Sequence, residues 1–323
     1  MRIGNIGTDV TRIGLGTWAI GGGPAFGSVD AEDLGIATIQ AAPGLGVNLI
    51  DTAPGYNFGR SEQIVGKAIA GRRDEYVIIT KCGLVWESEG SFFNKVGDRV
   101  LNRSLAPESI ERELDISLER LGTDHVDIYM THWPAIEPYN TPISQTVECL
   151  MRLKESGRIR GIGAANVDAD QVGEYLKHGE LDLVQLRYSI LDRAVEQNLI
   201  PTCIENGVTV QAYSPLEMGI LAGAVPRGYR PEPGNARAGK KWFEPARLEQ
   251  ALDMLDAWTP LREKYGCGTA DLAIAWILAQ NPNIAVLSGS ARPEELEQNV
   301  KALAIHLSPE DAAWMREYAE RLG

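Results

Sequence analysis

Short and nearly continuous apolar runs recur along the chain, and each is followed by a loop and then by a segment with helical periodicity. A strand that is buried on both faces shows such a continuous run, whereas a strand exposed on one face alternates apolar and polar residues. The pattern therefore predicts parallel strands covered by helices. Eight such strands are expected, at residues 13–17, 47–50, 76–80, 126–131, 159–164, 181–186, 208–213 and 284–287.

Helix start and stop signals lie between these runs. Asp30 is suited to cap a helix that continues through Leu34. Pro107 opens a helical segment that ends before Gly122, and Ser308 precedes a first-turn proline in the last helical segment. Strands and helices thus alternate along the chain, and no Ser/Gly-rich linker divides them.

Eight strand–helix units in one domain over residues 1–323 predict a (β/α)8 barrel, the TIM barrel of the α/β class. An open, doubly wound parallel sheet is the alternative. Residues 1–12 are expected to form a small β-hairpin with Gly7-Thr8 near its turn, and the helix after Pro309 is an addition to the barrel.

Two connections, 82–106 and 214–243, are longer than the usual loop between a strand and the next helix. Both follow the carboxyl end of a predicted strand. Long loops at that face of a barrel usually build the active site.

Composition narrows the classes of function. The chain has 31 Lys and Arg against 44 Asp and Glu, a formal net charge of −13 that argues against a general nucleic-acid binder. The longest apolar run, 272–279, is far shorter than the ~20 residues that a membrane span needs, and the first residues lack a secretory apolar segment. The four cysteines are widely spaced, so we expect a cytoplasmic protein without a metal site.

Four reactive side chains follow three consecutive predicted strands. Asp51 comes directly after the second strand, and Tyr56 lies five residues further on. Lys81 follows the third strand and His132 follows the fourth. Each residue alone has a simple structural explanation, but the carboxyl ends of barrel strands meet at one face. The four side chains therefore predict a common site.

The chemistry of these four groups suggests one reaction. A tyrosine hydroxyl has a pKa near 10, and an ammonium such as that of Lys81 would lower it. A buried Lys81 needs the carboxylate of Asp51 to remain charged. His132 would then orient a substrate carbonyl. Such a site polarises a C=O bond and protonates its oxygen, so the electrons must come from a cofactor.

Six segments, 51–69, 80–83, 131–134, 161–168, 184–193 and 211–223, resemble the signature segments of the aldo-keto reductase superfamily and occur in the same order. The bacterial branches whose second motif reads GRSE are the most similar, and the resemblance covers essentially the whole chain. It implies a barrel that reversibly reduces an aldehyde or ketone, a sugar among the candidates, with a nicotinamide cofactor. The resemblance assigns Tyr56 as general acid/base, Lys81 and Asp51 as the groups that tune it, and His132 as the group that orients the carbonyl.

The same resemblance implies the cofactor contacts. Tyr213 stacks on the nicotinamide, while Asn166 and Gln185 bind its carboxamide. Other predicted contacts are Gly16, Thr17, Trp18 and Asp51 near the nicotinamide, Ser214, Pro215, Leu216, Gly219 and Leu221 along the pyrophosphate, and Ser288, Gly289, Ser290, Arg292, Glu295, Gln298 and Asn299 at the adenosine end.

The resemblance favours NADP(H). Glu295, however, occupies a position where many relatives have an arginine or glutamine, and a carboxylate there would repel a 2′-phosphate. Only Arg292 is placed to compensate for it. NAD(H) is therefore the alternative cofactor.

The substrate is expected to contact Tyr56, His132 and three tryptophans, Trp18, Trp86 and Trp133, with Phe26, Phe92 and Phe93 at the rim of the same pocket. The partner implied is a small carbonyl compound, and the oligomeric state is left open. Two other functions remain. Lys81 could form a Schiff base in a lyase, although Asp51 opposes the low pKa that this needs, and the same fold serves as a cofactor-binding regulatory subunit.

Overall fold

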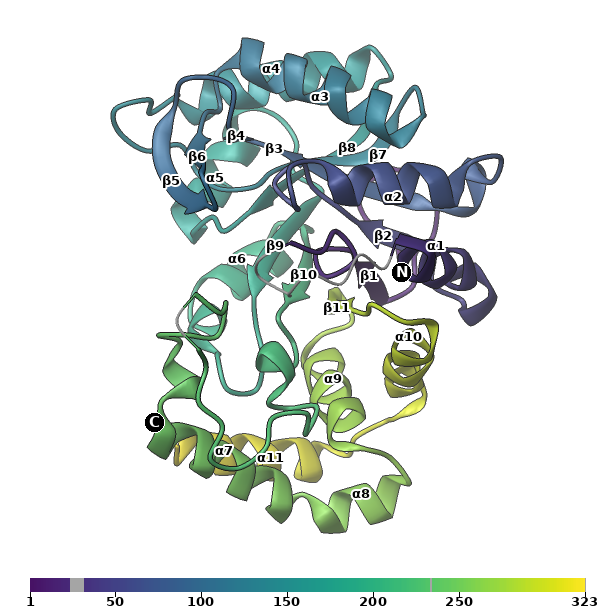
Figure 1. Cartoon of the computed structure of the whole chain (residues 1–323), viewed down its shortest axis with the longest axis vertical. Coiled ribbons are helices and arrows are strands. Elements are labelled where there is room, and N and C mark those ends of the chain that lie inside the picture. The colour runs from purple at the N-terminus through teal and green to yellow at the C-terminus, as the bar shows by residue number, and fades with distance from the viewer. Residues whose placement is uncertain (24–31, 233, 323) are drawn as a thin grey trace.

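Eight parallel strands close into a barrel at the centre of the computed structural model, which describes residues 1–23, 32–232 and 234–322 (Figure 1). Each strand pairs in parallel with the next one around the barrel, and the last pairs with the first. All eight predicted strands are confirmed, as is the closed barrel over the open sheet. The strands are β1 (Ile13–Gly16), β2 (Leu49–Asp51), β3 (Val77–Cys82), β7 (Val126–Thr131), β8 (Ile159–Ala165), β9 (Leu183–Arg187), β10 (Thr209–Tyr213) and β11 (Ile284–Gly289).

Helices surround the barrel. Pro107 is the first residue of α3, Gly122 ends that helix with a left-handed φ of 64°, and Ser308 caps the last helix by accepting the Asp311 N–H at 3.2 Å. These caps confirm the predicted ends, whereas Asp30 lies outside the described residues. The helices are α1 (Glu32–Ala41), α2 (Arg60–Ile69), α3 (Pro107–Leu121), α4 (Ile143–Glu155), α5 (Ala169–His178), α6 (Leu199–Glu205), α7 (Pro245–Ala257), α8 (Thr259–Tyr265), α9 (Thr269–Gln280), α10 (Pro293–Val300) and α11 (Pro309–Glu320).

Short 3-10 helices fill several connections: η1 (Pro43–Leu45), η2 (Arg73–Glu75), η3 (Ala194–Glu196), η4 (Glu217–Gly219), η5 (Lys241–Phe243) and η6 (Lys301–Ala304). None of the helices within the described ranges is long and apolar enough to cross a membrane.

The barrel is packed on both sides of its wall. Outside the wall, the apolar faces of the helices cover the strands in one large cluster of buried side chains. Inside it, Leu49, Ile79 and Ile128 form a second cluster that Ile3 and Ile6 of the first segment close from below. Burial on both faces explains why the strands read as continuous apolar runs.

The predicted N-terminal hairpin is reduced to one antiparallel bridge. Arg2 pairs with Asp9, and the backbone N–H groups of residues 1 and 10 each donate to the other residue's carbonyl oxygen at 2.8 Å. The segment thus turns back at 3–8 without forming two strands, because its apolar residues pack into the barrel floor instead.

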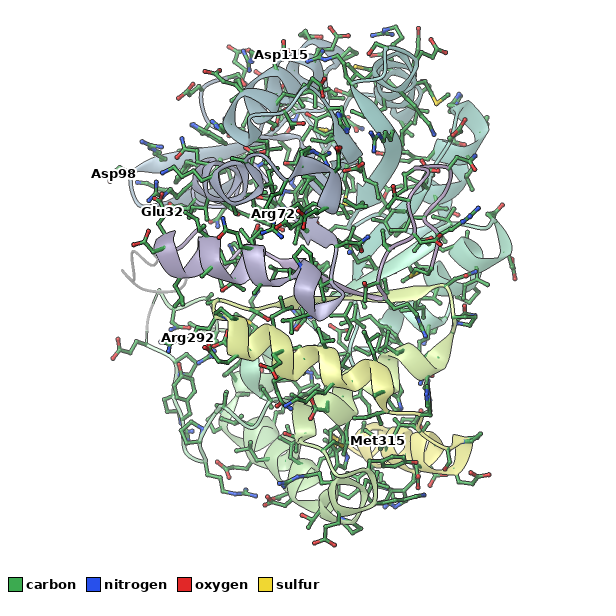
Figure 2. All side chains as sticks on the ribbon, turned by 90° about the vertical axis from the view of Figure 1, so that its right-hand side faces the viewer. Glu32, Arg72, Asp98, Asp115, Arg292 and Met315 are labelled. Atoms are coloured by element: carbon green, nitrogen blue, oxygen red, sulfur yellow. The ribbon has the colours of Figure 1, made fainter. Side chains whose placement is uncertain are left out.

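The first long connection has a regular structure that was not predicted. It contains β4 (Leu84–Val85), β5 (Ser91–Val96) and β6 (Arg99–Arg103), which form an antiparallel sheet in the order β4-β6-β5. Gly97, with φ 60°, and Asp98 make the turn between β5 and β6, and Asp98 lies at the outer edge of the molecule (Figure 2). The second long connection, 214–243, carries only η4 and η5 among its described residues.

Candidate active site

The ammonium of Lys81 is the centre of the predicted quartet. Its side chain is fully buried, and Nζ donates to Asp51 Oδ1 at 2.7 Å, to the Thr52 carbonyl oxygen at 3.0 Å and to the Tyr56 hydroxyl at 2.9 Å. The Tyr56 hydroxyl also lies 3.4 Å from Asp51 Oδ1. The structure therefore brings Tyr56 together with Lys81 and Asp51, the two residues that were expected to tune its pKa.

His132 completes the quartet from the neighbouring strand. Its ring meets the Tyr56 ring edge-on, with 5.7 Å between centroids and 82° between planes. Its backbone N–H donates to the Cys82 carbonyl at 2.9 Å, and its carbonyl accepts from Asn166 Nδ2 at 2.9 Å. Burial and the nearby Lys81 ammonium hold the pKa of His132 well below its usual range, so the imidazole is neutral at pH 7.

The proton affinity of Tyr56 differs from the prediction. We expected the Lys81 ammonium to make the phenol more acidic, but burial and then the Asp51 carboxylate raise the pKa of Tyr56 well above its ordinary value. Burial also lowers the pKa of Lys81, and Asp51 opposes that change. Tyr56 is consequently protonated at neutral pH, which suits a group that must donate a proton.

A strained turn follows Tyr56. Asn57 and Phe58 have φ values of 51° and 54°, and Gly59 has a φ of 85°. Left-handed conformations are unfavourable for residues other than glycine and persist only when neighbouring contacts hold them. One such contact is the bond from Asn57 Nδ2 to the Gly21 carbonyl at 2.9 Å.

Two side-chain amides lie next to the quartet, one on Asn166 directly after β8 and one on Gln185 of β9. Gln185 Nε2 donates to Asp51 Oδ2 and to Gln211 Oε1, both at 2.8 Å. Both hydrogens of this amide are therefore in use, and its carbonyl oxygen is the atom left to accept a carboxamide N–H. Asn166 Oδ1 accepts the Tyr213 hydroxyl at 2.7 Å, which holds the partly buried Tyr213 ring at the carboxyl end of β10.

The residues predicted near the nicotinamide differ in whether they support the barrel strands or face the site. Gly16 is paired with Asp51 across β1 and β2, and the buried Thr17 hydroxyl donates to the Asp51 backbone oxygen at 2.8 Å. Trp18 is 43% exposed, and its ring centroid lies 6.4 Å from that of Tyr56. Thr17 therefore supports β2, whereas Trp18 faces the site.

The predicted pyrophosphate segment leaves β10 in a sharp turn. Ser214 has a φ of 55°, and Pro215 and Leu216 lead into η4, which ends at Gly219 with φ 100°. The side chain of Leu221 is fully buried in the apolar cluster, so only its backbone is available to a ligand.

Two basic groups support this segment. Glu217 is buried and bonded to the guanidinium of Arg187, a pair that sequence reasoning missed. Arg237 stacks over Tyr229 and Phe243, with 5.6 Å from its Cζ to each ring centroid. One terminal nitrogen of Arg237 lies beside Gly219, so positive charge borders the segment where an anionic cofactor was predicted.

The predicted adenosine end lies at the start of α10. The buried Ser288 hydroxyl has no hydrogen-bond partner among the described residues. A side chain at Gly289 would meet no atom of the described chain within 4 Å. An unsatisfied hydroxyl beside open backbone fits a polar ligand. Arg292 precedes the first turn of α10 (Figure 2).

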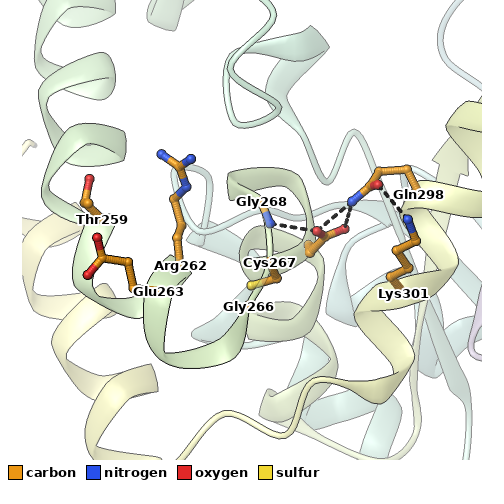
Figure 3. A pocket seen from close by; sticks show the side chains of 9 residues that line it. Thr259, Arg262, Glu263, Gly266, Cys267, Gly268, Gln298 and Lys301 are labelled. Carbon is orange, nitrogen blue, oxygen red and sulfur yellow. Dashed lines mark hydrogen bonds between the residues drawn. The ribbon is translucent and has the colours of Figure 1, made fainter.

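Other members of the adenosine set are bonded to the protein itself. Asn299 Nδ2 donates to Ser290 Oγ at 3.0 Å. Glu295 Oε2 accepts the Ala291 N–H at 2.8 Å. Gln298 donates to Asp271 at 2.7 and 2.9 Å and lines a hollow of about 440 Å³ between α8, α9 and α10 (Figure 3).

The aromatic residues predicted for the substrate pocket differ in their surroundings. Trp86 packs edge-on against Phe58 at 5.3 Å, and Trp133 lies 5.5 Å from Phe93. Phe92 is 66% exposed, because neighbouring strand residues point to opposite faces, so it is not a pocket residue. Phe26 lies outside the described residues.

Two features near these rings were not predicted. The Arg103 guanidinium lies against both the Phe93 and Trp133 rings, with its Cζ atom 4.9 and 5.0 Å from their centroids. Glu62 is fully buried beside β3. Its burial could have been predicted from the sequence, because Glu62 lies on the apolar face of α2 together with Val65 and Ile69.

The chain is similar to known proteins over most of its length. The family model "Aldo/keto reductase family" matches residues 12–320. An Escherichia coli (strain K12) protein named "NADH-specific methylglyoxal reductase" is 55% identical over 318 residues, covering 98% of this chain and 97% of that protein. "Aldo-keto reductase YhdN" from Bacillus subtilis (strain 168) is 36% identical over 312 residues, covering 96% of this chain and 90% of that protein.

Solved structures match the whole fold. The glycerol dehydrogenase AKR11B4 from Gluconobacter oxydans has a TM-score of 0.90 at 30% identity and covers 99% of this chain and 95% of its own. An aldo/keto reductase from Klebsiella pneumoniae in complex with NADP and acetate has a TM-score of 0.72 at 28% identity, with 96% and 92% covered. The chain therefore belongs to the aldo-keto reductase family and is an oxidoreductase that reduces carbonyl groups with a nicotinamide cofactor.

Proposed function

We propose that this enzyme reduces small α-oxoaldehydes such as methylglyoxal with NADH, and that Tyr56 is the proton donor. The observation that carries the proposal is the buried Lys81 ammonium, which bonds both the Asp51 carboxylate and the Tyr56 hydroxyl. A bound nicotinamide cofactor would supply the hydride. The residues of this chain then have to hold the carbonyl, protonate its oxygen and exclude water.

Tyr56 gives its proton to the oxygen of the carbonyl group as that oxygen gains negative charge. Lys81 stabilises the phenolate left behind, because its ammonium already donates to the phenol oxygen at 2.9 Å. Asp51 keeps the lysine charged in its buried setting. The neutral imidazole of His132 donates one N–H to the same carbonyl oxygen and so orients the substrate.

The Tyr213 ring and the quartet would hold the nicotinamide ring of a bound cofactor. The free oxygen of Gln185 and the remaining N–H of Asn166 bind its carboxamide. The segment 214–221 and the neighbouring Arg237 would hold the pyrophosphate. Ser288 and the backbone of Gly289 are available to the adenosine end.

NADH replaces NADP(H) as the preferred cofactor in this proposal. The 55% identical relative is named as NADH-specific, which weakens the sequence-based preference for NADP(H). Glu295 supports the same choice, because the Ala291 N–H holds its carboxylate at the first turn of α10. A fixed negative charge there would repel the 2′-phosphate of NADPH.

The substrate class rests on the same relative and on the enclosing aromatic rings. Trp18 and Trp86 stand close to Tyr56 and its following turn, which favours a short carbonyl compound over a branched one. Methylglyoxal is small enough to enter and carries an activated aldehyde.

Turnover measurements test the proposal. Purified protein is mixed with NADH or NADPH and with methylglyoxal, glyceraldehyde or a ketose, and loss of the reduced nicotinamide absorbance is followed. We expect methylglyoxal with NADH to give the highest kcat/KM, at least about tenfold above NADPH, which corresponds to ~1.4 kcal/mol. Cofactor binding without turnover of any carbonyl would instead support a regulatory subunit, and borohydride trapping of substrate on Lys81 would support a lyase.

A further inference from the structure

The turn after Tyr56 leaves no room for a side chain at its third residue. A Cβ atom at Gly59 would lie 2.4 Å from Cζ of Arg120, a residue near the end of α3. Gly59 also has a φ of 85°, a conformation that favours glycine, and a side chain there would displace the Arg120 guanidinium. The guanidinium of Arg120 therefore packs directly against the turn that carries Tyr56.

Arg120 is itself held in place by a buried acid. Its Nη1 donates to Glu62 Oε2 at 3.0 Å, and the Glu62 side chain is fully buried at the start of α2. The Cζ atom of Arg120 also lies 5.6 Å from the centre of the Trp86 ring. One guanidinium thus contacts the turn 57–59, the buried carboxylate and an aromatic ring of the predicted substrate wall.

The same carboxylate is bonded to the strand that carries Lys81. Thr80 Oγ1 donates to Glu62 Oε1 at 2.6 Å. Thr80 and Lys81 are adjacent on β3, so their side chains leave opposite faces of the barrel wall, Lys81 towards the site and Thr80 towards the helices. Glu62 therefore holds β3 from the helix side of the barrel wall, next to the position where the Lys81 side chain points into the site.

We propose that the Glu62–Arg120 ion pair is a positioning unit that clamps the 57–59 turn to β3 and so holds the Tyr56 hydroxyl within hydrogen-bonding distance of the Lys81 ammonium. The inference rests on the proposed role of Tyr56 as proton donor. A second effect follows from charge, because Glu62 favours the protonated form of Lys81 through the barrel wall. The charged and titratable groups that face Glu62 are Arg120 and Glu113 on α3, Lys81 on β3 and Tyr129 on β7.

The first test is Glu62→Gln, which keeps an oxygen for Thr80 and removes the charge. We expect kcat with methylglyoxal and NADH to fall about tenfold with little change in the KM for NADH, because displaced reacting groups lower the rate more than cofactor binding. Removal of a negative charge favours phenolate over phenol and amine over ammonium. The basic limb of the kcat profile should therefore move to lower pH. A limb that stays in place or moves to higher pH overturns the inference.

Arg120→Lys separates positioning from charge. Lysine keeps the positive charge near Glu62 but lacks the flat group that fills the space beside Gly59. We expect kcat to fall severalfold while the basic limb stays at its wild-type pH. An unchanged kcat overturns the clamp, and this variant decides the question if Glu62→Gln does not fold.

The matched control is Glu196→Gln. Glu196 forms a half-buried pair with Arg316 between η3 and α11 and accepts the Tyr188 hydroxyl, and the structure gives it no bond to the four site residues. We expect the Glu196→Gln variant to have a lower melting temperature than the wild-type protein, with the same kcat and the same dependence of kcat on pH. If Glu196→Gln lowers kcat as much as Glu62→Gln does, a general loss of stability explains both and the inference fails. Absence of turnover in the wild-type protein would instead refute the proposed function.

Discussion

The side-chain amide of Gln185 donates to Oδ2 of Asp51 at 2.8 Å, although 134 residues separate the two in the chain. The other oxygen of the same carboxylate accepts from Lys81 at 2.7 Å. Both oxygens of Asp51 are therefore engaged, one by a neutral donor and one by a buried cation. This arrangement fixes the carboxylate, and through it the ammonium that faces Tyr56.

Tyr56→Phe tests the proton donor. Loss of the hydroxyl should lower kcat by ~10²-fold or more, since general acid catalysis contributes about 10²–10⁴-fold, while the Kd for NADH stays within about twofold. Steady-state kinetics and fluorescence titration with NADH measure the two quantities. Tyr139→Phe, at an exposed tyrosine, is the control. A fully active Tyr56→Phe enzyme would remove this residue from the mechanism.

Asp51→Asn tests the buried charge pair. The substitution leaves the Lys81 ammonium buried without a carboxylate, so the lysine should lose its proton or destabilise the fold. We expect the free energy of unfolding to fall by about 3 kcal/mol and kcat to fall by ~10²-fold. Urea unfolding and steady-state kinetics provide the measurements. The control Asp98→Asn, at the outer edge of the molecule, should change neither quantity, and neutral behaviour of Asp51→Asn would contradict the assigned role.

Glu295→Gln tests cofactor choice. The glutamine oxygen can still accept the Ala291 N–H, so the local backbone should be kept while the negative charge is lost. We expect the KM for NADPH to fall about fivefold and the KM for NADH to change by less than twofold, since one charge near a phosphate at a solvent-exposed site contributes about 1 kcal/mol. Glu294→Gln, an exposed neighbour on the same turn, is the control. Equal effects on the two cofactors would show that Glu295 does not face the 2′ position.

Glu113 should make stability depend on pH. This carboxyl accepts the Gly83 N–H at 2.9 Å, and burial raises its pKa to about 8. At pH values between about 4.5, its ordinary pKa, and about 8, Glu113 is ionised in the unfolded chain but keeps its proton in the folded chain. The unfolding free energy therefore falls as pH rises through this window, by ~3 kcal/mol at pH 7 as an order of magnitude, and levels off above pH 8.

Glu113→Gln should remove that dependence. The glutamine keeps an acceptor for Gly83 and cannot ionise, so its gain in melting temperature over wild type should be larger at pH 8 than at pH 5. Differential scanning calorimetry at both pH values measures the gain. Glu111→Gln, at a half-exposed position on the same helix, is the control. If the gain in melting temperature of Glu113→Gln over wild type is the same at pH 5 and pH 8, the Glu113 carboxyl is ionised in the folded protein.

The order of the strands and helices could be predicted from the sequence because burial on both faces leaves a continuous apolar run in each barrel strand. The helix ends at Pro107 and Ser308 were predictable for a similar reason, since capping depends on neighbours within one turn. The small sheet of β4, β5 and β6 was not predicted, because its alternating exposure blends with the polar pattern of a loop.

By itself, the sequence determined that Asp51, Tyr56, Lys81 and His132 follow strands of one barrel, and hence that they meet at one face. Only the tertiary structure decided how protons are held there, because burial and then the Asp51 carboxylate raise the pKa of Tyr56. The tertiary structure also decided which polar residues on the helix side of the barrel wall position the site, as we propose for Glu62 and Arg120. Such contacts join segments far apart in the chain, and no local pattern of residues encodes the distance between them.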